Sequence, residues 1–167
     1  MTVVGVEDAN DFAGVRANIR RVAAALGRAP QGEALVSRMD GELATAAGAW
    51  RGRRALYLTP GGFTAGPGTL VGAMMGAAGM SNAARTPGFA PAPLEDLVMH
   101  PPDAAVLGFF DRASSSTQHW SLADHPALKA AMRGRIVASL PGAILGCPAW
   151  FAADGVRDLA AAARARR

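Results

Sequence analysis

The chain has 167 residues, of which 50% are hydrophobic and 18% are charged. This length is sufficient for one domain with a sizeable core, and the hydrophobic content excludes an intrinsically disordered chain. No run approaches the ~18 uninterrupted apolar residues of a membrane-spanning helix. The formal net charge is +4, but the arginines are spread along the chain and are not interleaved with aromatic residues. We therefore expect a soluble globular protein that does not bind nucleic acid.

The first fifty residues predict a short strand followed by two helices. Thr2–Val6 is rich in valine and is typical of a buried strand. Asn10 or Asp11 can cap the helix that follows, whose apolar positions recur at helical spacing until a glycine ends it. Pro30 suits the first turn of a second, longer helix that runs to about Ala49.

The remainder of the sequence alternates strands with helices. The predicted strands are the apolar segments Ala55–Thr59, Ala104–Phe109 and Ile136–Leu140. Helices are expected at Leu70–Ala78, Leu94–Met99, Asp124–Met132 and Trp150–Arg164, and loops at Ser81–Pro93, Asp111–His119 and Pro141–Pro148. This alternation predicts an α/β fold: a three-layer, mainly parallel, Rossmann-like sheet with helices on both faces, preceded by the long helix.

Parallel sheets of this kind bind ligands at the carboxyl ends of their strands. In this sequence those ends lead into Pro60–Thr69, Phe110–His119 and Pro141–Pro148. The first of these loops is glycine-rich, but it lacks the lysine and the Ser/Thr of a phosphate-binding loop, and its glycines do not have the dinucleotide-binding spacing. We interpret it as a tight turn that brings the backbone close to a ligand or to another loop.

Patterns typical of catalysis or metal binding are not evident in the sequence. The three histidines form no metal-ligand pair, and Cys147 is the only cysteine, which excludes an intrachain disulfide. No Gly-x-Ser-x-Gly motif marks a serine hydrolase. Cys147 with His119 would be a nucleophile and its base; the alternative for Cys147 is a small apolar packing residue. The sequence therefore predicts no cofactor, no metal and no catalytic residue.

The few aromatic residues gather near the expected binding end. Phe63, Phe89, Trp120 and Trp150 fall in or beside the loops there, where each can contact a ligand or fill the core. Phe63 stands among small residues that do not bury it well. Arg112 can pair with a carboxylate or with the negative charge of a ferric chelate. We expect these five residues to bind the ligand.

Several segments together resemble the helical-backbone class of periplasmic binding proteins, which serve ABC importers of vitamin B12, ferric siderophores and haem. Ala29–Ala49 is similar to the long helix that joins the two lobes of that class, and Arg54–Thr69 is similar to the first strand and ligand loop of its second lobe. Gly76–Ala84 and Pro93–Leu107 resemble the next turn and the segment before the following strand. The order and spacing of these segments carry the resemblance.

The resemblance implies roles for individual residues. Phe63 and Phe89 match aromatic ligand contacts of the vitamin B12 binder, and Glu95 matches the glutamate that docks onto arginines of the membrane permease. A carboxylate that faces an arginine fork makes a directed, charge-assisted contact. Glu95 is also a first-turn residue favoured by the helix dipole, and both roles stay open. The resemblance further implies a periplasmic location, a metal-chelate ligand and an ABC permease in the inner membrane as partner.

The sequence departs from this class in the first lobe. Residues 1–28 resemble only the last strand and helix of that lobe, residues 29–50 the linking helix, and residues 51–167 the second lobe. Half of the cleft is therefore expected to be missing, which leaves a fragment, a degenerate half, or a homodimer whose second copy supplies the missing wall. The N-terminus has no signal-peptide pattern.

We expect a substrate-binding component of an ABC importer, not an enzyme, for a ferric siderophore, corrinoid or haem. Two alternatives remain open. One is a doubly wound enzyme that binds an anionic substrate at Pro60–Thr69. The other is a non-binding interaction module that kept the fold and Glu95 but lost its pocket.

Overall fold

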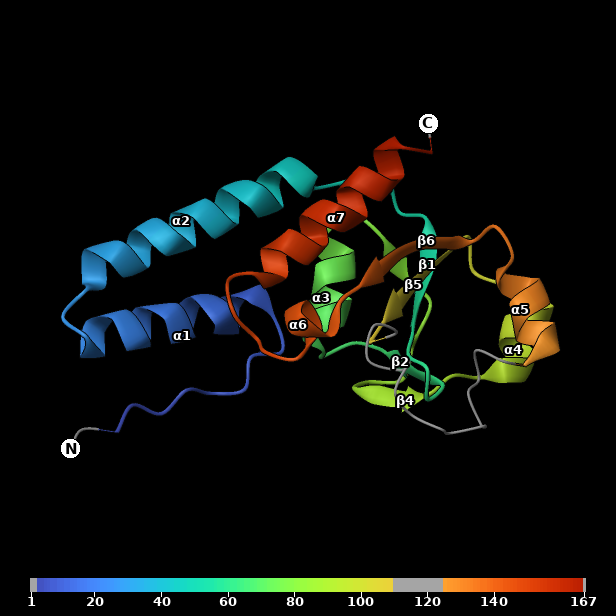
Figure 1. Cartoon of the computed structure of the whole chain (residues 1–167), viewed down its shortest axis with the longest axis horizontal. Helices are drawn as coiled ribbons and strands as arrows, with labels where there is room; N and C mark the ends of the chain where they lie inside the picture. The colour runs from blue at the N-terminus through green and yellow to red at the C-terminus, as the bar shows by residue number, and fades with distance from the viewer. Residues whose placement is uncertain (1–2, 110–124, 167) are drawn as a thin grey trace.

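The computed structural model describes residues 3–109 and 125–166, which form seven helices and six strands (Figure 1). In chain order these are α1 (Phe12–Ala25), α2 (Ala29–Ala46), β1 (Arg54–Leu58), β2 (Phe63–Ala65), α3 (Leu70–Ala77), β3 (Ser81–Asn82), β4 (Phe89–Pro91), α4 (Leu94–Met99), β5 (Ala104–Gly108), α5 (Pro126–Met132), β6 (Ile136–Leu140), α6 (Gly142–Leu145) and α7 (Ala152–Arg164). Within the described ranges, no helix combines the length and the apolarity needed to cross a membrane.

Four strands form one parallel sheet in the order β3-β1-β5-β6. Successive residues of a strand point to opposite faces of the sheet. Both faces of β1 are buried: Ala55 and Tyr57 belong to one core cluster, and Leu56 and Leu58 to the other. A strand segment covered on both faces is apolar at successive positions, which explains why residues 55–58 form a continuous apolar run and show no alternation.

Helices cover the sheet on both sides, with α3 and α7 on one face and α4 and α5 on the other (Figure 1). Met74 of α3 and Val156 of α7 pack in the first core cluster, while Leu97 of α4 and Leu128 of α5 pack in the second. The predicted three-layer α/β fold with a mainly parallel sheet is therefore confirmed.

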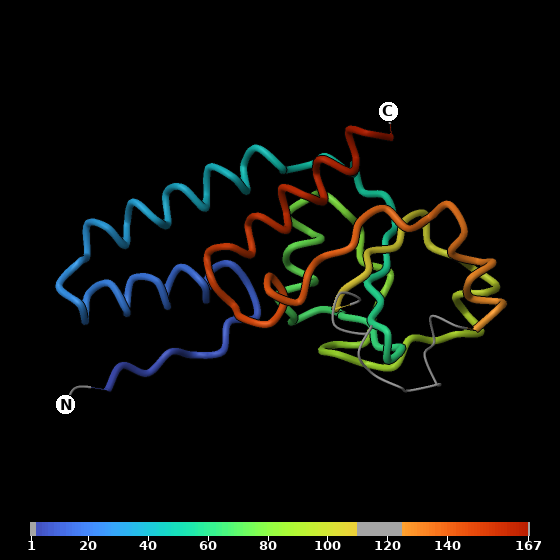
Figure 2. Tube along the Cα trace, viewed as in Figure 1, coloured from blue at the N-terminus to red at the C-terminus, as the bar shows by residue number. Residues whose placement is uncertain are grey.

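The first two helices form a hairpin that extends beyond the sheet, and α7 runs beside α2 (Figure 2). Asp11 caps α1, because its carboxylate accepts a hydrogen bond of 2.8 Å from the backbone N–H of Gly14. Gly27 allows the turn between the helices with a φ of +66°. Gly32 permits their close packing, since a Cβ there would lie 2.5 Å from the Cβ of Ala23.

Trp50 connects this hairpin to the layer of helices on the sheet. Its side chain is buried, and its indole N–H donates a hydrogen bond of 2.8 Å to the carbonyl oxygen of Leu159 in α7. Its backbone N–H donates to the carbonyl oxygen of Ala78, directly after α3. Since Trp50 lies between α2 and β1, these two bonds fix where the sheet begins relative to the hairpin.

The structure differs from the sequence-based predictions at the N-terminus and in the loops. Residues 3–6, predicted as part of a buried strand, are irregular and exposed, because no strand of the described chain lies beside them to pair with their backbone groups. The predicted loops at 60–69, 81–93 and 141–148 contain β2, then β3 and β4, and α6. These elements are two to four residues long, too short to show a periodic pattern of apolar residues.

Replacing Trp50 with phenylalanine should lower the free energy of unfolding by about 1–3 kcal/mol, because the buried hydrogen bond from the indole N–H to the carbonyl oxygen of Leu159 is lost. Urea unfolding followed by circular dichroism measures this change. Trp150→Phe serves as the control, since the indole N–H of Trp150 makes no hydrogen bond within the described residues. An equal loss in both variants would contradict the role given to the Trp50 hydrogen bond.

Candidate functional site

β1 and β5 are adjacent parallel strands, so their carboxyl ends lie side by side. The chain leaves these two ends toward opposite faces of the sheet. The connection after β1 crosses the face that carries α3 and reaches β3. The connection after β5 includes α5 on the other face and reaches β6. Open parallel sheets bind ligands in the crevice at such a switch point. In this chain the described residues there are the turn at residues 59–63 and Phe109, directly after β5.

The turn after β1 holds Phe63 at the surface. The backbone N–H of Gly62 donates to the carbonyl oxygen of Thr59, and the N–H of Thr59 donates to the carbonyl oxygen of Phe63, both at 3.0 Å. The hydroxyl of Thr59 accepts a third bond of 3.1 Å from the N–H of Phe63. Gly62 has a φ of +78°, which favours glycine at this position. The backbone is thus fixed while the Phe63 side chain remains 46% exposed.

Phe63 and Phe89 lie on the same face of a two-stranded ribbon. β2 and β4 pair in antiparallel orientation, with Phe63 opposite Pro91 and Ala65 opposite Phe89. Opposed residues and residues two apart share a face of a ribbon, so the two phenylalanines are diagonal neighbours. Phe89 is 60% exposed. The ribbon follows directly from the turn after β1 and packs against that strand (Figure 1). It therefore presents two exposed aromatic side chains beside the switch point.

Gly66 determines how this ribbon joins the rest of the structure. Its N–H donates a hydrogen bond of 2.9 Å to the carbonyl oxygen of Gly88, and a Cβ at this position would overlap the carbonyl oxygen of Thr86. The hydroxyl of Thr69 donates to the carbonyl oxygen of Gly66 at 2.8 Å and accepts from the N–H of Gly72, which caps α3. The glycine-rich loop is therefore closed onto the segment at 86–88, as expected for a turn that approaches another loop.

Trp150 contacts the helical hairpin. Its ring lies 4.4 Å below the guanidinium carbon of Arg38 on α2 and makes an edge-to-face contact with Phe151 at 5.8 Å. It lines an apolar cavity of about 420 Å³ between α1, α2 and residues 147–150. Cys147 lines the same cavity and is exposed, so the alternative of a small apolar packing residue does not place it in the core. The predicted ligand contact of Trp150 would thus involve the hairpin side of the molecule.

Glu95 lies in the first turn of α4 and is exposed. Its carboxylate makes no hydrogen bond or ion pair with any residue in the described ranges. The N-cap residue of α4, Pro93, makes no side-chain capping bond. The negative charge of Glu95 therefore also stabilises the free N–H groups in the first turn of this helix. Both roles predicted for Glu95 therefore fit its position. The other predicted ligand contacts, Arg112 and Trp120, lie outside the described residues.

Comparison with known proteins identifies the family. The sequence profile described as periplasmic binding protein matches residues 1–139. This chain belongs to the periplasmic binding protein family. The resemblance seen in the sequence is thereby confirmed at the level of the family. No curated protein matches the chain.

Solved structures of binding proteins share this fold. The periplasmic heme-binding protein RhuT from Roseiflexus sp. RS-1 is 28% identical with a TM-score of 0.70, and the match covers 92% of this chain and 63% of RhuT. The periplasmic heme-binding protein BhuT in complex with two hemes is 27% identical with a TM-score of 0.71, over 92% of this chain and 64% of BhuT. A possible iron-binding protein from Staphylococcus epidermidis has a TM-score of 0.76 at 16% identity, over 95% of this chain and 65% of its own. This chain thus spans less than two thirds of the length of these binding proteins.

Replacing Gly66 with alanine should lower the free energy of unfolding by about 1–3 kcal/mol, because the new methyl group overlaps the carbonyl oxygen of Thr86 and the backbone must move. Chemical unfolding followed by circular dichroism measures the loss. Gly61→Ala is the matched control in the same loop, since a Cβ there would make only ordinary contacts, with the Phe63 ring at 3.6 Å and the Thr59 hydroxyl at 4.0 Å. A stability of Gly66→Ala equal to that of Gly61→Ala would contradict this packing argument.

Proposed function

We propose that this chain is part of the substrate-binding component of an ABC importer for a metal chelate, with haem as the first candidate. Ferric siderophores and corrinoids are the other candidates of this class. The observation that carries the proposal is the pair of exposed phenylalanines, Phe63 and Phe89, on one face of the β2–β4 ribbon at the carboxyl end of β1. Aromatic side chains stack on the apolar faces of a flat macrocycle. The identity of 28% and 27% to two proteins named as heme-binding supports haem.

The size of this aromatic surface sets the affinity that it can supply. Because the two phenyl groups are already about half buried, burying their remaining exposed area would contribute about 1.5–3 kcal/mol. A dissociation constant of 1 μM requires about 8 kcal/mol, and association has its own entropic cost. Tight binding therefore needs a second wall over the ligand. In this proposal the chain by itself binds weakly, and the remainder of a two-lobed protein or a second copy supplies that wall.

We propose the same division of the chain that the sequence predicts. Residues 1–28 are the end of a first lobe, residues 29–50 the linking helix, and residues 51–167 the second lobe. The extension of the α1–α2 hairpin beyond the sheet supports this division (Figure 2). Coverage of only 63–65% of RhuT, BhuT and the staphylococcal protein is consistent with it. The protein acts in the periplasm beside an ABC permease and catalyses no reaction in this proposal.

The geometry of the glycine-rich loop weighs against the alternative enzyme that binds an anion there. A loop that binds phosphate needs free backbone N–H groups directed at the ligand. In this loop the N–H groups of Gly62, Phe63 and Gly66 all donate to atoms of the protein. The exposed aromatic rings beside this loop favour an apolar, stacking partner.

Haem added to the purified chain should bind saturably, and Phe63→Ala and Phe89→Ala should each weaken binding by about three- to tenfold, because each removes apolar area that the ligand buries. The shift of the haem absorbance band measures binding. A ferric hydroxamate siderophore and cyanocobalamin, tested in the same way, establish which member of the class is preferred.

Met99→Ala is the control for this experiment, since Met99 is 73% exposed but lies on α4. Its affinity for haem should equal that of the unchanged chain. Haem binding that survives the Phe63→Ala/Phe89→Ala double variant, or that Met99→Ala weakens equally, would show that the ribbon is not the binding surface.

Glu95→Gln tests the two roles of Glu95. Docking onto permease arginines predicts that binding of the chain to its permease in lipid nanodiscs weakens about tenfold or more, since the charge-assisted contact is lost. The helix-dipole role alone predicts unchanged docking and a loss of stability of about 0.3–1 kcal/mol. Glu33→Gln makes the same change at an exposed glutamate on α2 and should leave docking unchanged.

A further inference from the structure

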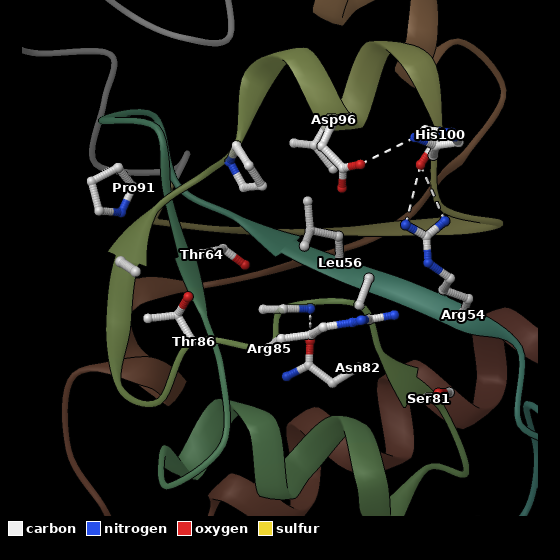
Figure 3. A pocket seen from close by; sticks show the side chains of 15 residues that line it. Arg54, Leu56, Thr64, Ser81, Asn82, Arg85, Thr86, Pro91, Asp96 and His100 are labelled. Carbon is white, nitrogen blue, oxygen red and sulfur yellow. Dashed lines mark hydrogen bonds and ion pairs between the residues drawn. The ribbon is translucent and has the colours of Figure 1, made fainter.

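A second hollow lies behind the aromatic face of the β2–β4 ribbon. It has a volume of about 630 Å³ and is enclosed by β1, β3, the ribbon and α4 (Figure 3). Thr64 and Ala90 line it, and both alternate along the ribbon with Phe63 and Phe89. Because alternate residues of a strand point to opposite faces, Thr64 and Ala90 line this cavity from the face of the ribbon opposite the two phenylalanines, while Pro91 at the end of β4 also borders it. Its volume falls within the range of about 300–1,000 Å³ that small-molecule sites occupy.

The charged groups of this cavity are predominantly cationic. Arg54 donates hydrogen bonds of 3.1–3.2 Å to the backbone carbonyl oxygens of His100 and Pro101, which leave its charge unneutralised. Arg85 makes no ion pair within the described residues and reaches into the cavity (Figure 3). Among the described residues that line the cavity, Asp96 is the one carboxylate, and it is hydrogen-bonded to His100 at 3.1 Å. Two guanidinium groups thus face a single, already bonded carboxylate, which favours an anionic ligand.

Thr64 provides an independent indication that a ligand belongs in this cavity. The residue is 3% exposed, and its hydroxyl has no hydrogen-bond partner. Figure 3 shows this hydroxyl directed toward the cavity from β2. Buried hydroxyl groups in native proteins are nearly always hydrogen-bonded, because leaving one unpaired is costly. A polar group of a ligand in the cavity would supply the missing partner.

We propose that this cavity is a binding site for a small polyhydroxylated dicarboxylate, distinct from the aromatic face proposed to bind the chelate. The carboxylates of the ligand pair with Arg85 and Arg54. Its hydroxyl groups bond to the hydroxyl of Thr64 and to Asp96, and Leu97 contacts its carbon chain. This site does not depend on the identity of the metal chelate or on whether the chain binds one.

Isothermal titration calorimetry with D-glucarate and adipate tests the proposal, because these six-carbon dicarboxylates differ only in their hydroxyl groups. D-glucarate should bind with one-to-one stoichiometry, and adipate should bind about tenfold more weakly. Arg85→Gln should weaken both ligands tenfold or more, since a charge-assisted contact is lost. Thr64→Val should weaken D-glucarate several-fold and leave adipate unchanged, while Thr64→Ser, which keeps the hydroxyl, should retain D-glucarate binding.

Arg28→Gln is the matched control, because Arg28 is an exposed arginine in the turn between α1 and α2 and lies outside this cavity. Its D-glucarate affinity should not change, and Arg85→Gln should bind haem as the unchanged chain does. Absence of D-glucarate binding overturns the proposal. It is also overturned if inorganic phosphate binds as tightly as D-glucarate, or if Arg28→Gln weakens binding as much as Arg85→Gln.

Discussion

The pairing of β1 on both of its edges is the constraint on which the rest of this structure depends. The strand lies between β3 and β5 and is buried on both faces, so it fixes both helical layers and the direction of the turn that follows it. Tyr57 is fully buried, which raises the pKa of its phenol, and its ring packs where a side chain at Gly108 would otherwise lie. Small residues on the neighbouring strand therefore allow the bulky residues of β1 to fit, and the aromatic ribbon starts from a rigid base.

The elements that contain enough residues for a periodic pattern were predictable from the sequence. The apolar runs of β1, β5 and β6 and the longer helices appear close to their predicted bounds, and Asp11 and Thr69 cap α1 and α3 as their side chains suggest. The α/β class followed from the alternation of these elements. Exposure of Phe63 was also predictable, because its neighbours are too small to cover a phenyl group.

The parts that could not be predicted depend on contacts between segments distant in sequence. β2 and β4 are three residues each and are defined only by pairing with one another across α3 and β3. The cavity on the other face of this ribbon combines Arg54, Arg85 and Asp96 from three segments, and none of them stands out in the sequence. The opposite error occurred at residues 3–6. Their composition predicted a strand, but they have no partner strand in the described chain and are irregular.

The β2–β4 ribbon joins two chain connections that belong to different helices. β2 leads into α3 and β4 leads into α4, and these helices lie on opposite faces of the sheet. A molecule that rests on both strands therefore touches two independently variable loops at once. Substitutions or insertions in either loop can change which molecule is preferred without altering any strand of the central sheet. The recognition surface is thereby free to diverge among relatives faster than the core that carries it.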